Sequence, residues 1–80
     1  MDREEILSQV QDIFRVILNS ESINLNDGTT ANDVEGWDSL THVQLISEIE
    51  KHFNIRFSLK EMLSWKTIGK MIDCIEKKVN

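Results

Sequence analysis

The chain has 80 residues, of which 40% are hydrophobic and 29% are charged, and its formal net charge is −5. A chain of this size forms one small domain with a modest core, so we expect a single domain over residues 1–80 without room for a deep catalytic pocket of its own. The negative charge opposes binding to a nucleic-acid backbone and favours basic protein surfaces as partners. The lack of proline and the low glycine count, three in all, favour helices over a turn-rich β fold.

Cysteine usage and the N-terminal residues bear on the cellular compartment. Cys74 is the one cysteine of the sequence, so an internal disulfide is excluded, and with two histidines no plausible metal-binding set emerges. The charged residues 1–5 are not followed by a long apolar run, which predicts neither a signal peptide nor a membrane span. We therefore expect a soluble, cytoplasmic and monomeric protein.

The first predicted helix covers the N-terminal part of the chain and ends near residues 19–20. Asp2, Glu4 and Glu5 stand at its start, where the helix dipole favours negative charge. Its apolar residues recur at helical spacing and form one stripe, which consists of Ile6, Val10, Ile13, Phe14 and Ile17.

A long polar loop follows from Glu21 to Asp38. Loops of this length are uncommon in compact domains and are often functional. We expect its apolar residues to pin it to the core; these are Ile23, Leu25, Val34 and Trp37.

The second predicted helix runs from Ser39 to about Phe53. At about 100° per residue, one broad face is expected to pack on the core. That face consists of His42, Val43, Leu45, Ile46, Ile49 and Phe53, and the opposite face of Gln44, Ser47, Glu48 and Lys51. Leu40 lies roughly 60° beyond the edge of the core face, so packing does not explain this large apolar residue.

Two further helices complete the predicted fold. Ser58 and Glu61 have the spacing of a capping box, which predicts a short third helix. The last helix is expected to begin near Thr67, because Ile68, Met71, Ile72, Ile75 and Val79 recur at helical spacing. The sequence therefore predicts an all-α fold, a small bundle of three longer helices and one short helix.

The tripeptide Asp38-Ser39-Leu40 stands where the long loop meets the second predicted helix. Taken alone, it has a purely structural interpretation, because aspartate and serine are both favoured N-caps. In its context, however, the chain resembles the acyl carrier protein family along nearly its whole length, which makes residues 1–80 one acyl carrier domain of the discrete type. The resemblance rests on residues 36–46 (GWDSLTHVQLI), 49–57 (IEKHFNIRF) and 67–68.

In that family, a separate transferase esterifies the serine of the motif with 4′-phosphopantetheine from coenzyme A, and the thiol of this arm carries an acyl group as a thioester. The resemblance assigns the attachment to Ser39 and makes the chain a carrier rather than an enzyme. A serine at a helix start suits this role, because the helix dipole favours the charge of a phosphodiester. The implied partners are a phosphopantetheinyl transferase, an acyl-loading ligase or acyltransferase, and a ketosynthase or other acyl-processing enzyme.

Five residues are expected to contact partners. The resemblance implies that Asp38 pairs with a basic residue of the transferase, a role compatible with N-capping. The off-core position of Leu40 suits an apolar pocket of a partner, although single surface leucines are normal. Gln44 and Glu48 lie on the outer face of the second predicted helix, which the resemblance makes the recognition helix for partners. Phe57 matches a position where the family presents an apolar residue, with buried packing as the alternative.

The recognition helix departs from the family pattern. Carriers of fatty-acid synthesis usually keep this helix densely acidic, whereas here Gln44 is neutral and Lys51 is basic. Such exposed charges affect partner choice more than the fold. We therefore expect a role in specialised lipid or polyketide-type biosynthesis. A peptidyl or aminoacyl carrier loaded by a stand-alone ligase is the alternative, although that branch usually has two glycines before its motif.

Two interpretations outside the family remain at this point. Ser39, His42 and Asp38 could form a hydrolase triad, but a triad needs an aspartate that orients the imidazole, an oxyanion hole and a cleft. We expect His42 instead to be partly buried and hydrogen-bonded. A helical protein-interaction module without a prosthetic group fits the periodicity and the charge equally well.

Overall fold

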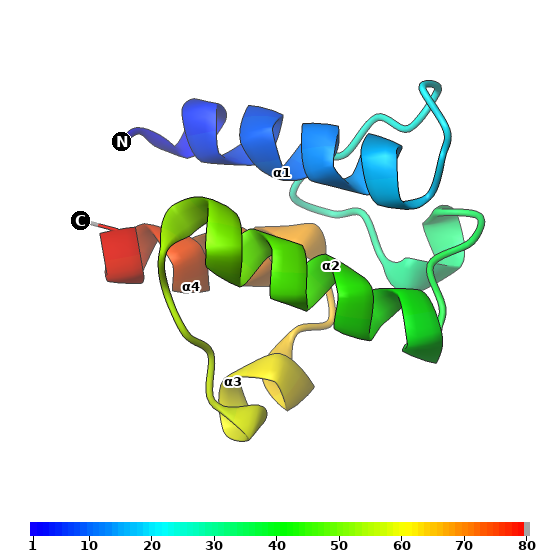
Figure 1. Ribbon diagram of the computed structural model, residues 1–80. Coiled ribbons are helices and arrows are strands. Elements are labelled where there is room, and N and C mark those ends of the chain that lie inside the picture. The colour runs from blue at the N-terminus through cyan, green and yellow to red at the C-terminus, as the bar shows by residue number, and fades with distance from the viewer. Residues whose placement is uncertain (80) are drawn as a thin grey trace.

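The computed structural model describes residues 1–79, which form four α-helices and one short 3₁₀ helix (Figure 1). The helices are α1 (Arg3–Ile17), α2 (Ser39–Phe53), α3 (Leu59–Ser64) and α4 (Ile68–Val79), and η1 (Ala31–Asp33) lies in the loop between α1 and α2. No strand occurs among residues 1–79. The predicted all-α fold of three longer helices and one short helix is therefore confirmed.

Side-chain caps fix where the helices begin. The Asp2 carboxylate accepts the Glu5 backbone N–H at 2.9 Å and caps α1. At α3 the predicted capping box is confirmed: the Ser58 hydroxyl accepts the Glu61 N–H at 3.1 Å, and the Glu61 carboxylate accepts the Ser58 N–H at 2.7 Å. The Ser58 N–H and further donors on Cys74 and Lys78 lower the pKa of Glu61 to about 2. The capping box thus fixes where this six-residue helix begins.

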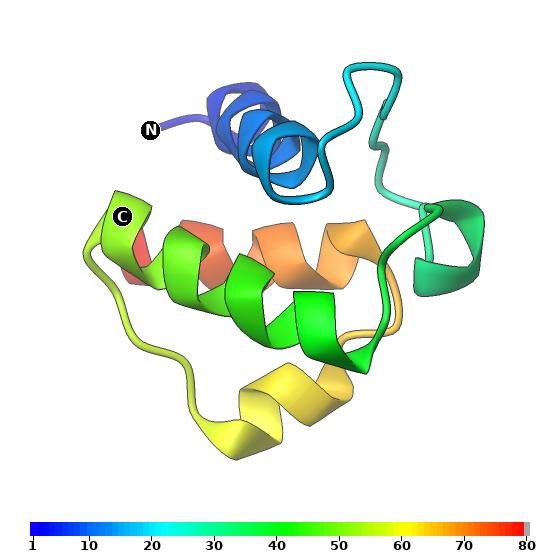
Figure 2. The ribbon, with the colours of Figure 1, turned by 45° about the vertical axis from the view of Figure 1, so that its right-hand side comes forward.

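Helix α1 lies across α2 and α4, and α3 packs beside α4 (Figure 2). The interior between the three longer helices is apolar and closed to solvent. Its fully buried side chains are Ile6, Val10, Phe14, Leu45, Ile49, Ile68, Met71, Ile72 and Ile75. Burial of these side chains stabilises the bundle, since each contributes about 1.5–3 kcal/mol relative to exposure.

The long loop is fastened to the core, as predicted. Leu25 and Val34 are buried, and Ile23 and Trp37 pack partly buried against the same cluster. Backbone bonds add to this anchoring, because the N–H groups of residues 68 and 69 donate to carbonyl oxygens of loop residues 29 and 27 at 2.8 and 2.9 Å. The loop therefore delivers the start of α2 to a fixed position.

One predicted core residue is exposed. The apolar pattern predicts Val43 on the buried face of α2, but its side chain is 67% exposed. Helix α3 packs on α4 and leaves this edge of α2 uncovered, so the buried arc of α2 is narrower than the apolar pattern indicated. Within residues 1–79, none of the helices combines the length and the apolar character that crossing a bilayer requires.

Candidate functional site at the start of α2

Asp38 is the N-cap of α2. Its Oδ1 accepts the backbone N–H groups of Leu40 and Thr41, both at 2.9 Å. The Thr41 hydroxyl completes a reciprocal box, accepting the Asp38 N–H at 2.8 Å and donating to the Gly36 carbonyl at 2.7 Å. These bonds hold the carboxylate in its charged form and lower the pKa of Asp38. The turn into the helix also needs Gly36, whose φ of 90° disfavours residues with a side chain.

Ser39 is the first residue of α2 and is exposed. Because Asp38 provides the cap, the Ser39 hydroxyl is not used to cap the helix. Within residues 1–79 the hydroxyl takes part in no hydrogen bond. The structure thus separates two roles that the sequence left combined, since Asp38 holds the helix end and Ser39 offers a free nucleophilic oxygen.

A groove of about 360 Å³ opens directly beside Ser39. It lies between η1, the start of α2 and the connection from α3 to α4. Its walls are formed by Ala31, Trp37, Asp38, Ser39, His42, Trp65 and Lys66. A bound group attached to the Ser39 oxygen would therefore begin at the rim of a partly aromatic groove.

An aromatic cluster shapes this groove. The Trp37 indole N–H donates to His42 Nδ1 at 3.0 Å, and the two rings stack with centroids 5.9 Å apart. Trp65 meets the His42 ring edge-on at 6.4 Å, and Trp37 packs edge-on against Phe14 at 5.0 Å. Burial lowers the pKa of His42, so the imidazole is held neutral. Because Nδ1 is an acceptor, the ring proton resides on Nε2.

This geometry does not form a catalytic triad. The nitrogen of His42 that an aspartate would orient accepts a hydrogen bond from Trp37, and the Asp38 carboxylate caps the helix instead. No hydrogen bond joins Ser39 to His42 in the described part of the chain. The expectation of a partly buried, hydrogen-bonded His42 is confirmed.

The residues expected to contact partners differ in their exposure to solvent. Leu40 is 79% exposed, and Gln44 and Glu48 lie exposed on the outer side of α2. Phe57, by contrast, is buried, with its ring edge-on to Trp65 at 4.7 Å. The buried alternative therefore describes Phe57, and an exposed apolar contact at this position does not match the structure.

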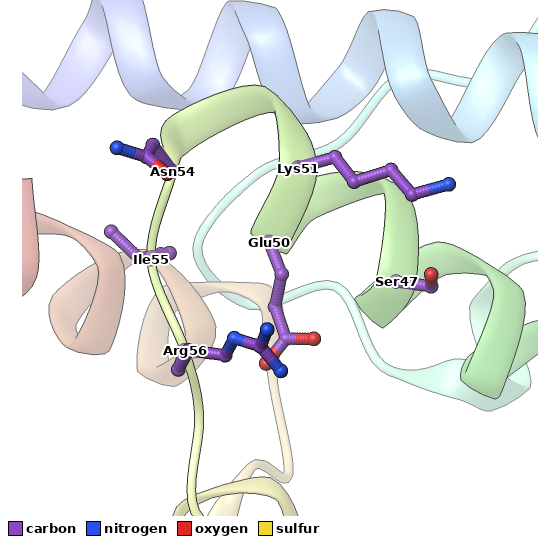
Figure 3. Close-up of a pocket in the computed structure, with 6 residues that line it drawn as sticks. All are labelled: Ser47, Glu50, Lys51, Asn54, Ile55 and Arg56. Atoms are coloured by element: carbon purple, nitrogen blue, oxygen red, sulfur yellow. The ribbon is translucent and has the colours of Figure 1, made fainter.

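The far end of α2 carries mixed charge. A hollow of about 260 Å³ there is lined by Ser47, Glu50, Lys51, Asn54, Ile55 and Arg56, so both acidic and basic side chains border it (Figure 3). Lys51 pairs with Glu48 at 3.7 Å. Residues 39–66 hold four basic and three acidic residues, although the whole chain has a net charge of −5. Helix α2 and the residues that follow it up to Lys66 are thus close to neutral.

Sequence reasoning missed three contributors to the site. Thr41 forms the second half of the cap, and the spacing of Asp38 and Thr41 is the signal that could have indicated it. The bond between Trp37 and His42, and the arrival of Trp65 in the same groove, depend on tertiary packing and have no local signal.

The residues at this site fit a covalently attached phosphopantetheine. A phosphodiester on Ser39 would lie at the N-terminus of α2, where the helix dipole favours negative charge. The exposed hydroxyl leaves an attached arm free to extend into solvent. An adjoining groove and the ammonium group of Lys66 add apolar and cationic contacts.

Comparison with known proteins agrees with this geometry. Residues 5–75 match the family model described as phosphopantetheine attachment site. An acyl carrier protein of Thermotoga maritima is 30% identical over 96% of this chain and 95% of its own length. The solution structure of a holo acyl carrier protein from Geobacter metallireducens superposes with a TM-score of 0.87 at 39% identity, covering 92% of this chain and 85% of that one.

A third relative is a much longer protein. A non-reducing polyketide synthase of Emericella nidulans is 30% identical over 89% of this chain, which spans only 3% of that protein. The chain belongs to the phosphopantetheine attachment site family, and within it to the acyl carrier proteins. It is accordingly a carrier of 4′-phosphopantetheine and not an enzyme.

Proposed function

We propose that Ser39 is the attachment residue and that the arm it carries holds an acyl group as a thioester for other enzymes. The observation that carries this proposal is the free, exposed hydroxyl at the first position of α2, beside a helix cap that does not need it. When bound, the prosthetic group supplies the thiol that forms the thioester.

Two residues of this chain, Ser39 and Asp38, have roles in the proposed modification. A phosphopantetheinyl transferase binds coenzyme A and the carrier; the Ser39 oxygen attacks the β-phosphorus, the hydroxyl proton passes to the transferase, and adenosine 3′,5′-bisphosphate leaves. Asp38 keeps the first turn of α2 in place through Oδ1. Capping does not occupy both of its carboxylate oxygens, which supports its pairing with a basic residue of the transferase.

The outer side of α2 is the proposed surface for acyl-processing enzymes. Leu40 offers an exposed apolar contact next to the attachment residue, and Gln44 and Glu48 follow along the same helix. Loading ligases or acyltransferases, and ketosynthases that take up the acyl group, would share this surface. The low net charge of residues 39–66 supports partners matched to this carrier in specialised lipid or polyketide-type biosynthesis, which we place in the cytoplasm.

Intact-mass spectrometry tests the attachment. The protein is incubated with coenzyme A and a broad-specificity phosphopantetheinyl transferase, and we expect a gain of one phosphopantetheine group. Ser39→Ala should abolish the gain, while Ser47→Ala, an exposed serine further along α2, should retain it. An unmodified wild-type protein would instead support a helical interaction module.

A second measurement addresses the cargo. The modified protein is offered acyl groups by acyl ligases and acyltransferases, and amino acids by stand-alone aminoacyl ligases. We expect thioester formation with acyl groups in preference to amino acids. Preferential loading of an amino acid would reassign the chain to the peptidyl and aminoacyl carriers.

A further inference from the structure

The groove beside Ser39 has a wall of aromatic side chains that the attachment reaction itself does not require. We infer that it receives the pantoyl segment of the chain's own prosthetic group, with Trp37, His42 and Trp65 as the contact residues. This inference rests on the proposed attachment at Ser39 and specifies where the arm rests between encounters with enzymes.

Covalent proximity selects the pantoyl segment. Ser39 itself lines the groove, so whatever is bonded to its oxygen starts at the groove's rim. The phosphate and the branched pantoyl carbons follow within a few bonds, whereas the thiol and its cargo lie at the far end of the arm. The near segment can fill the groove without the arm doubling back.

The chemistry of the walls matches this segment. The geminal methyl groups of the pantoyl unit are apolar and suit the indole rings of Trp37 and Trp65, which both contact the His42 imidazole. A volume of about 360 Å³ leaves room for a branched group of this size.

The polar atoms of the groove also match those of the pantoyl segment and the phosphodiester. His42 Nδ1 is occupied by the Trp37 indole N–H, which leaves Nε2–H as a donor for the pantoyl hydroxyl or the first amide oxygen. Lys66 also lines the groove, and the structure gives its ammonium no ion-pair partner within residues 1–79. Its charge suits the phosphodiester at the rim.

The two tryptophans make this inference measurable, because the chain has no others and both line the groove. Isotope-labelled protein is converted from the unmodified to the modified form, and the two indole N–H signals are followed by NMR. We expect both signals to shift on conversion, and nuclear Overhauser effects to join the geminal methyl protons to indole ring protons. Ser39→Ala protein treated in the same way should show neither change.

A matched pair of variants in η1 tests the groove without removing any packed aromatic ring. Ala31 lines the groove and Asn32 does not, although both are exposed. Ala31→Glu places bulk and negative charge in the groove, so the methyl-to-indole effects should be lost while attachment is retained. Asn32→Glu adds the same charge one residue away and should leave these effects intact.

The outcomes separate the inference from the proposed function. A fully modified protein whose geminal methyl protons show no contact to either indole would overturn the inference and leave the attachment in place. Contacts to the indoles from the thiol end or from an acyl group alone would also overturn it, since a different occupant would then fill the groove. A wild-type protein that remains unmodified would contradict both the inference about the groove and the proposed attachment at Ser39.

Discussion

At the residue scale, Asp38 combines a helix cap with a position next to the proposed attachment residue. Replacing it with alanine removes the acceptor for two backbone N–H groups, so Asp38→Ala should lower the urea midpoint of unfolding. Asp38→Asn should lower this midpoint less than Asp38→Ala does, because an amide oxygen still caps the helix. Equal decreases of the urea midpoint in the two variants would contradict the capping role.

The charge of Asp38 adds a dependence on pH. Its pKa is lowered from the ordinary value of 3.8, so the folded state favours the carboxylate. The resulting stability is fully present above that ordinary value and is lost as the pH falls through the lower pKa of the folded state. The difference in unfolding free energy between the wild type and Asp38→Asn should therefore shrink on acidification, which urea titrations at several pH values can measure.

His42 should make the unfolding free energy depend on pH in a higher pH range than Asp38 does. Burial lowers its pKa below the ordinary 6.5, so the unfolded chain takes up a proton first as the pH falls. The wild type should lose unfolding free energy relative to His42→Gln as the pH falls below about 6.5. An NMR titration gives the pKa of His42 directly, and a value at or above 6.5 would contradict the neutral, buried ring.

At this scale the sequence predicted the position of Ser39 at the start of α2 and the exposure of Leu40, because both depend on local position relative to a helix. It did not predict how the aromatic residues interact. Trp37 and Trp65 are 28 positions apart in the chain, and only the packing of the loop and the α3–α4 connection brings both to His42.

At the element scale, α2 turns one apolar side chain fully outward at its first turn. Leu40→Ala should leave the unfolding free energy nearly unchanged, since the side chain is 79% exposed. If a partner's apolar pocket receives it, kcat/KM for modification by the transferase should fall about fivefold or more. Val16→Ala, which removes a similarly exposed side chain from α1, serves as the control and should have no effect on modification. Unchanged kinetics for Leu40→Ala would exclude the contact.

The helices were largely predictable because each carries a strong periodic stripe or a recognisable cap. The sequence pattern misplaced Val43 and left the burial of Phe57 open, and both residues lie where neighbouring elements decide burial. Val43 is exposed because α3 does not cover its side of α2, and Phe57 is buried because Trp65 packs against it. Neither neighbour is evident from the local pattern.

At the scale of the whole molecule, the long loop is fastened to the start of α4 by a close backbone approach. A Cβ on Gly69 would lie 2.8 Å from the Asp27 carbonyl oxygen, which already accepts the Gly69 N–H at 2.9 Å. Gly69→Ala should therefore push the loop away and cost about 1–3 kcal/mol of unfolding free energy.

Gly28→Ala provides the matched comparison in the same region. Its added Cβ would meet only the Asn26 side chain at an ordinary 3.5 Å, so urea denaturation should show a far smaller change. A similar loss of unfolding free energy in Gly69→Ala and Gly28→Ala would indicate that the backbone approach at Gly69 does not anchor the loop. The sequence predicted that the loop is pinned by apolar residues, but a backbone-to-backbone approach leaves no mark on residue type beyond a glycine.

The central claim is that the free hydroxyl at the first position of α2 receives the phosphopantetheine arm. Peptide mapping by tandem mass spectrometry after incubation with coenzyme A and a broad-specificity transferase tests it most directly. We predict that the modification lies on Ser39 and on no other serine or threonine. Modification at another residue, or none at all on correctly folded protein, would contradict the account.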